Sequence, residues 1–335
     1  MIKNAQKPLL LAFRLDPSEA QAVLQLAEQW GCPLAVEPLS QLSQIQHPLV
    51  VPATASVFET LATDYRPDLL VQLGPVPAGK AALDFIKNTP LPLVEIHTRI
   101  VTQNPFHKPG QWLKNPLQNL ATELDSRTRI DSVALCKTIQ LKHQITLQKT
   151  LEGPFSEAQA IQHLINAMPQ GNLFLGNSLT LRLAGQVQHP STTAPRQVFA
   201  NRGVSGIDGL IATSVGVAMG NNTPTLSIIG DISALYDLNA LQMLVACKVP
   251  VVVVILNNFG GEIFAKLPVG KLPEANRYFK TQHALEFESA AALFKLPYQR
   301  ITALKDLKSA LTAPRRSRVM ECVFEPPSGQ KPSPH

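Results

Sequence analysis

The sequence predicts an α/β protein with two doubly wound parallel-sheet domains. Short apolar runs alternate with helical patterns, and this alternation occurs twice, on either side of a polar stretch. The runs are continuous in Val, Ile and Leu, which indicates strands buried on both faces and hence parallel sheets. A chain of 335 residues is long enough for two domains of ordinary size.

The first domain is expected over residues 1–129. It opens with a strand at 8–13 and a helix in which Asp16, Pro17 and Glu19 form a capping box with proline at the first helical position. Gly31 is well placed to end that helix. No G-x-G-x-x-G turn occurs, so we expect a Rossmann-like domain that binds no dinucleotide. The other expected elements are strands at 34–36, 69–73 and 91–96 and a helix near 78–87.

The second domain is expected over residues 130–328, after a connection at 99–129 that is rich in Pro, Asn, Gln and Lys. Ser156 and Gln159 resemble a capping box that opens one of its helices. Its expected helices are 130–151, 157–168, 179–184, 209–219, 234–246 and 284–294, with one more before the last strand. Its expected strands are 172–175, 197–200, 225–229, 250–256, 298–301 and 318–324. We expect an open loop from 264 to 280 and a frayed tail at 329–335.

Composition excludes several classes of protein. The net charge is +6, but the basic residues are scattered, so nucleic-acid binding is not favoured. Four cysteines without a C-x-x-C pair indicate neither a disulfide framework nor a zinc site, and favour a reducing cytosol. The longest apolar run, 249–256, is far shorter than the roughly 20 residues of a membrane helix. We expect a soluble, cytoplasmic protein without a signal peptide.

Two predicted buried strands end in small side chains that carry oxygen. Asp231 follows the strand at 225–229, and Asn258 follows the strand at 250–256. A parallel β-α-β crossover brings both to the carboxyl edge of the sheet, where open α/β sheets bind ligands. Gly-Asp and Asn-Asn are each common turn dipeptides on their own. Together at this spacing, they indicate a site for a hard divalent cation such as Mg²⁺.

Two further features fit this edge of the sheet. The Gly260-Gly261 pair allows a backbone carbonyl to approach an ion closely. Ser233 and the amides that open the next helix indicate a place for a phosphate group. The expected ligand is therefore a metal ion together with a phosphate-bearing molecule.

Four ordered blocks resemble one enzyme family. They are GNSLTLRL (176–183), NRGVSGIDGL (201–210), GDISALYDLNAL (230–241) and NNFGGEIF (257–264). They look like the 2-succinyl-5-enolpyruvyl-6-hydroxy-3-cyclohexene-1-carboxylate synthases of menaquinone and phylloquinone biosynthesis, which are thiamine diphosphate enzymes. Many thiamine diphosphate enzymes have glycine where this chain has Ile232, and in this family another residue is normal there.

The resemblance implies thiamine diphosphate as the cofactor. It also implies that Mg²⁺, or Mn²⁺, is held by Asp231, Asn258 and the backbone carbonyl of Gly260. Ile207 corresponds to the bulky catalytic residue that bends the cofactor, although by position alone it is equally well interpreted as a core isoleucine. The other cofactor contacts implied are Ile232, Ser233, Ile263 and Phe264.

The resemblance implies decarboxylation of 2-oxoglutarate and 1,4-addition of the resulting carbanion to isochorismate. Both substrates carry carboxylates, which the planar fork of arginine binds well. Arg182 and Arg202 match the family's arginines and are expected to be catalytic and substrate-binding, with Ser178 as a nearby hydroxyl. In the first domain, VQLGPVPAGKAAL resembles a loop of the family's middle domain. Lys80 there matches a basic position, followed by Ala81 where the family often has arginine.

The family's full-length members begin with a pyrimidine-binding domain that has no counterpart in this sequence. We expect activity to need that domain, from another chain or a longer precursor, and we expect a homo-oligomer. Two alternatives remain: a silent remnant or assembly subunit that keeps diphosphate and metal binding, or a lyase of the acetolactate-synthase type. The R-G-V-S-G-I-D-G block argues against the second.

Overall fold

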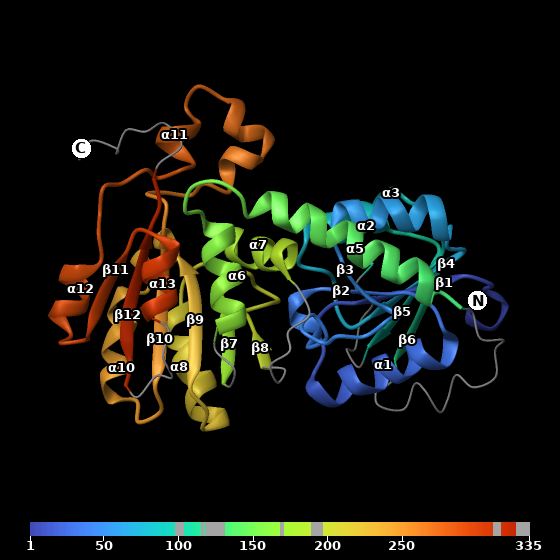
Figure 1. Cartoon of the computed structure of the whole chain (residues 1–335), viewed down its shortest axis with the longest axis horizontal. Helices are drawn as coiled ribbons and strands as arrows, with labels where there is room; N and C mark the ends of the chain where they lie inside the picture. Colours follow the sequence, from blue (N-terminus) through green and yellow to red (C-terminus); the bar gives the residue numbers. More distant parts are fainter. Residues whose placement is uncertain are drawn as a thin grey trace. The chain divides into compact units, whose positions relative to one another are not determined.

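The computed structural model describes residues 1–97, 104–114, 117, 131–167, 171–188, 197–310 and 316–325. Contacts divide the chain into two compact units, Met1–Glu152 with Ala184–Pro195 and Gly153–Leu183 with Arg196–His335. Each unit contains one six-stranded sheet (Figure 1). All pairings between these strands are parallel. The predicted fold class is confirmed.

The first sheet has the strand order β3-β2-β1-β4-β5-β6. Its strands are β1 Pro8–Ala12, β2 Leu34–Val36, β3 Val50–Pro52, β4 Leu69–Leu73, β5 Leu93–His97 and β6 Gly110–Lys114. Its main helices are α1 Pro17–Trp30, α2 Ala55–Thr60, α3 Lys80–Asn88 and α5 Val133–Thr150. Short helical turns add η1 Ile2–Asn4, η2 Pro38–Ser40 and the π-helical η3 Leu61–Tyr65. Helix α1 covers one face of the sheet, and α2, α3 and α5 cover the other (Figure 1).

Helix α1 shows how local sequence sets an element. The Asp16 backbone N–H donates to Glu19 Oε2 at 2.9 Å, completing the predicted capping box. Gly31 ends the helix in the left-handed region at φ 66°, which costs glycine little. The buried face of the helix packs on the sheet through Val23, Leu26, Ala27 and Trp30.

The first half of the chain differs from the sequence-based expectations in three respects. The connection expected at 99–129 contains β6, which extends the sheet beside β5; as a half-exposed edge strand it has no apolar run to reveal it. The short elements β3, α2 and η3 were not predicted. Helix α5, expected in the second domain, belongs to the first unit because its buried Cys136 and Ile139 join that unit's core.

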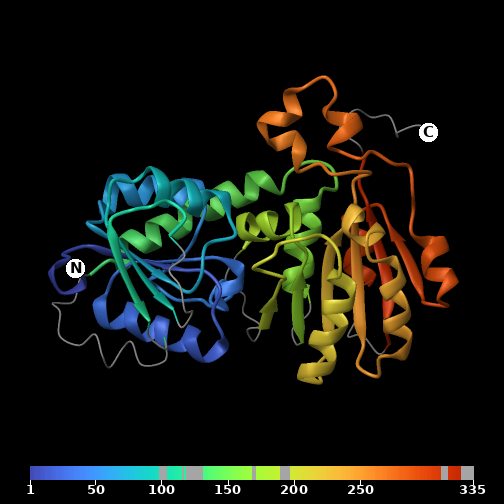
Figure 2. The ribbon, with the colours of Figure 1, turned by 180° about the vertical axis from the view of Figure 1, so that it is seen from behind.

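The second sheet has the strand order β11-β12-β10-β9-β7-β8. Its strands are β7 Asn172–Leu175, β8 Gln197–Phe199, β9 Thr225–Gly230, β10 Val251–Asn257, β11 Tyr298–Ile301 and β12 Arg318–Val323. Its helices include α6 Glu157–Ala167, α7 Leu179–Val187, α8 Leu210–Asn221, α9 Asp231–Leu235, α10 Leu241–Ala246, α12 Glu288–Leu293 and α13 Leu304–Ala310. Helices α6 and α13 lie over one face (Figure 1) and α8 and α10 over the other (Figure 2).

Three predictions for the second half also need correction. The helix expected at 234–246 is broken into α9, the 3-10 turn η5 Leu238–Ala240 and α10. The break frees Asp237, whose Oδ2 accepts the N–H groups of Ile211 and Ala212 at 2.7 and 3.0 Å and caps α8. The loop expected to be open at 264–280 contains η6 Phe264–Lys266, η7 Pro268–Lys271 and α11 Ala275–Tyr278. The helix expected at 284–294 begins only at Glu288.

Two remaining sequence predictions concern the tail and the membrane. The tail expected at 329–335 lies outside the described residues. Along the part of the chain that the structure describes, no helix is both long and apolar enough to cross a membrane.

Candidate functional site

A cavity of about 140 Å³ lies at the carboxyl edge of the second sheet. Strand β7 is flanked by β8 on one side and β9 on the other, so the chain changes direction across the sheet here. Such a switch point is where open α/β sheets bind ligands. The lining residues are Glu157, Asn177, Ser178, Leu179, Thr180, Ile207, Gly230, Asp231, Ile232, Ser233, Asn258, Gly260, Gly261, Glu262, Ile263 and Phe264.

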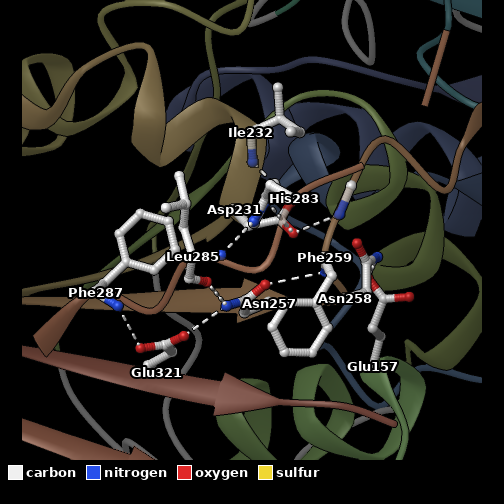
Figure 3. Close-up of polar contacts among 11 residues, drawn as sticks. Glu157, Asp231, Ile232, Asn257, Asn258, Phe259, His283, Leu285, Phe287 and Glu321 are labelled. Carbon is white, nitrogen blue, oxygen red and sulfur yellow. Dashed lines mark hydrogen bonds and ion pairs between the residues drawn. The ribbon is translucent and has the colours of Figure 1, made fainter. Parts of the chain in front are cut away.

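Asp231 is the first residue of α9, directly after β9, and is only 2% exposed. Its Oδ1 accepts the Ile232 N–H at 2.7 Å, and its Oδ2 accepts the Gly260 N–H at 2.9 Å. The Nε2 atom of His283 lies 3.2 Å from the same Oδ2. A buried carboxylate is thus held in one orientation beside the cavity by groups from both sides (Figure 3).

The two asparagines that follow β10 point in opposite directions (Figure 3). Asn257 Nδ2 donates to Glu321 Oε1 at 2.6 Å beneath the sheet edge, and Asn257 Oδ1 accepts the Phe259 N–H at 3.0 Å. Asn258 faces the cavity, and its Nδ2 donates to Glu157 Oε1 at 3.0 Å. Asn258 Oδ1 is buried and has no hydrogen-bond partner among the described residues. Asn257 is therefore structural, whereas Asn258 presents an unused acceptor.

Gly260 is required by its conformation and by its neighbours. Its φ is 154°, and a Cβ added there would lie 2.8 Å from the Lys280 carbonyl oxygen. Its own carbonyl accepts the Glu262 N–H at 3.0 Å, which leaves a second lone pair on that oxygen. Glycine at this position therefore lets the loop after β10 pass close to the segment around Lys280.

Glu157, on the cavity wall, is a group with a strongly shifted pKa. Burial raises the pKa of this carboxyl group to about 7. The Lys266 ammonium group opposes the rise, the Asp231 carboxylate adds to it, and the hydrogen bond from Asn258 opposes it. Perturbed acids of this kind gather at functional sites.

Three oxygen atoms at this cavity are suitable ligands for a hard divalent cation. They are the Asp231 carboxylate, the unpartnered Asn258 Oδ1 and the Gly260 carbonyl, all oxygen atoms of the kind Mg²⁺ prefers. Among the described residues, no group of three or more His, Cys, Asp or Glu side chains could hold a metal ion by itself. A set with one carboxylate leaves coordination positions for phosphate oxygens and water, which is typical of magnesium.

Most of the site residues expected from the sequence line this cavity: Ser178, Ile207, Asp231, Ile232, Ser233, Asn258, Gly260, Ile263 and Phe264. The two expected arginines do not line it, although they bond to groups next to it. Arg182 Nη1 donates to the Ser178 carbonyl at 3.1 Å, and Arg202 Nη1 lies 3.4 Å from Asn177 Oδ1. Burial lowers the pKa of Arg182. Lys80 is in the other unit, on α3, where it pairs with Asp84.

The residues that the sequence reasoning missed include Asn177 and Glu157, which line the cavity, and His283, which lies beside Asp231. Asn177 lies inside the block 176–183, two residues after the end of β7, and the rule that found Asp231 could have found it. Its Nδ2 donates to the Gly206 carbonyl at 2.6 Å and joins two of the four blocks. Glu157 and His283 carry no local signal, because each approaches the site only through the fold.

The comparison with known protein families indicates the class of protein to which this chain is similar. Residues 184–321 match the family model described as "Thiamine pyrophosphate enzyme, C-terminal TPP binding domain". This part of the chain is therefore similar to the TPP-binding domain of the thiamine pyrophosphate enzymes. Thiamine diphosphate is the cofactor that such a domain binds.

A more specific similarity is to one curated relative, which aligns with nearly the whole chain. Over 345 aligned positions, the chain is 32% identical to a 2-succinyl-5-enolpyruvyl-6-hydroxy-3-cyclohexene-1-carboxylate synthase of Aeromonas salmonicida (strain A449), and the match takes in 95% of this chain. The resemblance seen in the four sequence blocks is thus confirmed. The chain spans 56% of the length of that relative.

A solved structure supports the fold. It belongs to a protein isolated from Mycobacterium smegmatis and described as a candidate thiamin diphosphate-dependent enzyme. The TM-score is 0.64 at 19% identity, and the match covers 96% of this chain and 62% of that one.

Proposed function

We propose that this chain forms the diphosphate- and metal-binding part of an enzyme that decarboxylates 2-oxoglutarate and adds the product carbanion to isochorismate. The observation that carries the proposal is the convergence of Asp231, Asn258 and Gly260 at one cavity, with Asn258 Oδ1 buried and unpartnered. The similarity to the Aeromonas synthase supports the choice of substrates.

The proposed work of the metal-site residues is to hold and orient. Asp231, Asn258 and the Gly260 carbonyl hold Mg²⁺ or Mn²⁺, and both ions suit these oxygen ligands. Ile207 lines the cavity as an apolar wall that supports a bent cofactor. Thiamine diphosphate supplies the electron sink for decarboxylation and carbon–carbon bond formation.

The remaining contacts are proposed along the rest of the wall. Ser233, Ile232, Ile263 and Phe264 line the cavity and are proposed to contact the cofactor. The side chains of Ile232, Ile263 and Phe264 are proposed to exclude water from the apolar side of the cavity. The Ser233 hydroxyl is proposed to face the diphosphate.

Arg182, Arg202 and Ser178 are the proposed substrate contacts in this unit. Both substrates are anions, and the planar guanidinium group of an arginine carries five N–H donors that suit a carboxylate. Lys80, the first residue of α3, is proposed as a further basic contact.

We propose that turnover also needs a pyrimidine-binding domain, supplied by another chain or by a longer precursor, and that the protein works as a cytoplasmic homo-oligomer. That domain would provide the glutamate that the resemblance implies for the aminopyrimidine end of the cofactor.

The metal site is tested by isothermal titration calorimetry with thiamine diphosphate and Mg²⁺. We expect a binding heat for the wild type and its loss in Asp231→Ala, because that substitution removes the one carboxylate among the ligands. The matched control is Asp208→Ala, an exposed aspartate of the same unit that does not line the cavity. Unchanged binding in Asp231→Ala would overturn the metal assignment.

The same preparation separates the proposal from its alternatives. Assayed alone with 2-oxoglutarate and isochorismate, the chain should bind the cofactor but turn over little substrate, and adding a pyrimidine-binding domain should raise turnover. Binding that never leads to turnover under either condition would favour a silent remnant or an assembly subunit.

A further inference from the structure

Glu157 stands beside a proposed metal ligand, and the proposed function gives it no role. It is the first residue of α6, 101 positions before Asn258 in the chain. Its Oε1 accepts the Asn258 Nδ2 group at 3.0 Å (Figure 3). On the other side of the same amide, Asn258 Oδ1 is buried and has no partner among the described residues.

The hydrogen bond decides which end of the Asn258 amide faces the cavity. An asparagine amide has an oxygen that only accepts and a nitrogen that only donates. Glu157 Oε1 accepts the Asn258 Nδ2–H group, so the NH₂ end of the amide faces Glu157 and the oxygen end points away from Glu157. A cation binds the oxygen end alone, and a flipped amide would present N–H groups to it.

The elements on either side make this contact a fixed one. Glu157 is set by the predicted capping box of α6, where Gln159 and Ser156 exchange hydrogen bonds at 3.2 and 3.4 Å. The chain beside Asn258 is set by Asn257, which is tied to Glu321 beneath the sheet edge at 2.6 Å. These contacts fix the backbone from which each of the two side chains projects.

We propose that Glu157 is a positioning residue that holds the Asn258 amide with Oδ1 toward the metal ion. The proposal rests on the proposed function for the identity of the ion. The orientation of the amide itself can be tested without any ion.

The first measurement follows the Asn258 side-chain NH₂ group by ¹⁵N NMR, with its signal identified by its absence in Asn258→Ala. In the metal-free wild type we expect slow hydrogen exchange, because the group is hydrogen-bonded. Glu157→Gln keeps an acceptor oxygen and should keep slow exchange. The methionine in Glu157→Met is as long as the glutamine in Glu157→Gln and is also uncharged, but it has no oxygen acceptor. In Glu157→Met the Asn258 NH₂ group should therefore exchange fast.

The second measurement is the dissociation constant of Mn²⁺ in the presence of thiamine diphosphate, followed by electron paramagnetic resonance. Losing the outer partner of a metal ligand typically weakens binding about 10- to 100-fold, and we expect a loss of that size in Glu157→Met. Glu157→Gln should stay near the wild-type value. Equal losses in both variants would mean that only the charge of Glu157 matters, and would overturn the positioning role.

The two failures can be told apart. If the wild type binds no Mn²⁺, the proposed function fails, and the NMR comparison alone then decides the role of Glu157. If the wild type binds Mn²⁺ and Asp231→Ala does not, the proposed metal site stands. In that case, a wild-type Mn²⁺ affinity in Glu157→Met would contradict the positioning role of Glu157. Should Glu157→Met not fold, as judged by circular dichroism, Glu157→Ala takes its place.

Discussion

At the scale of single residues, Glu321 supports the strand end from which Asn258 projects. It is fully buried, at 0% exposure, in β12. Its Oε1 accepts the Asn257 amide at 2.6 Å, and its Oε2 accepts the Phe287 N–H at 2.8 Å and the Tyr298 hydroxyl at 2.6 Å. Burial and this carboxylate raise the pKa of Tyr298, so the hydroxyl keeps its proton. A buried charge is tolerated only with such partners.

Replacing Glu321 should therefore destabilise the second unit. In Glu321→Gln the new NH₂ group faces a donor, and an unsatisfied buried group costs about 1–3 kcal/mol. Tyr298→Phe, which removes one donor and leaves two, should cost about 1 kcal/mol. Urea unfolding and hydrogen exchange at the Phe287 amide measure the loss. The exposed Glu325→Gln is the control, and a loss in Glu321→Gln no larger than in this control would contradict the argument.

The residue scale also shows what sequence could and could not foresee. Asp231 and Asn258 were predictable because each directly follows a buried strand, and strand ends carry ligand groups. The partners Glu157 and Glu321 lie 101 and 64 positions from the asparagines that they bind. No local pattern carries information over such a separation, so these contacts required the fold.

At the scale of elements, the sequence predicted features that depend on neighbouring residues and missed features that depend on tertiary contacts. Both predicted capping boxes are present, because a cap depends only on residues three positions apart. The break between α9 and α10 was missed, because Asp237 leaves one helix to cap another. Strand β6 was missed because an edge strand needs no apolar run.

Helix α6 should make stability depend on pH through His163. Burial, and then the nearby Lys308 on α13, lower the pKa of His163 from 6.5. Below about pH 6.5 the His163 imidazole is protonated in the unfolded chain but stays neutral in the folded chain until a lower pH. The free energy of unfolding therefore falls as pH falls through this range. Above that pH the residue contributes no pH dependence.

Urea unfolding midpoints between about pH 5 and 8 test this prediction. His163→Gln should flatten the loss of stability below pH 6.5 relative to the wild type. Lys308→Gln should flatten it partly, because the pKa of His163 would rise toward its ordinary value. An unchanged slope in His163→Gln would show that other groups carry the pH dependence.

At the scale of the whole molecule, two similar sheets present very different carboxyl edges. In the first unit, the Glu37 carboxylate follows β2 and accepts the N–H groups of Ala78 and Gly79 at 2.9 and 2.7 Å. These amides open α3, so a phosphate would meet a carboxylate already in its place. In the second unit, Asp231 and Asn258 present oxygen atoms at a cavity, as a metal-bound diphosphate needs.

We expect thiamine diphosphate with Mg²⁺ to slow amide hydrogen exchange at one of these edges only. The amides of Ile232 and Gly260, which donate to Asp231, should gain protection, because a ligand that binds only the closed form suppresses local opening about 100-fold at a concentration of about 100 times its dissociation constant. The amides of Ala78 and Gly79 serve as the internal control and should not change. Removing the metal with EDTA should abolish the protection, because the diphosphate and the carboxylate then repel each other. Protection at the control amides without protection beside Asp231 would place the site in the first unit and contradict both the fold argument and the proposed function.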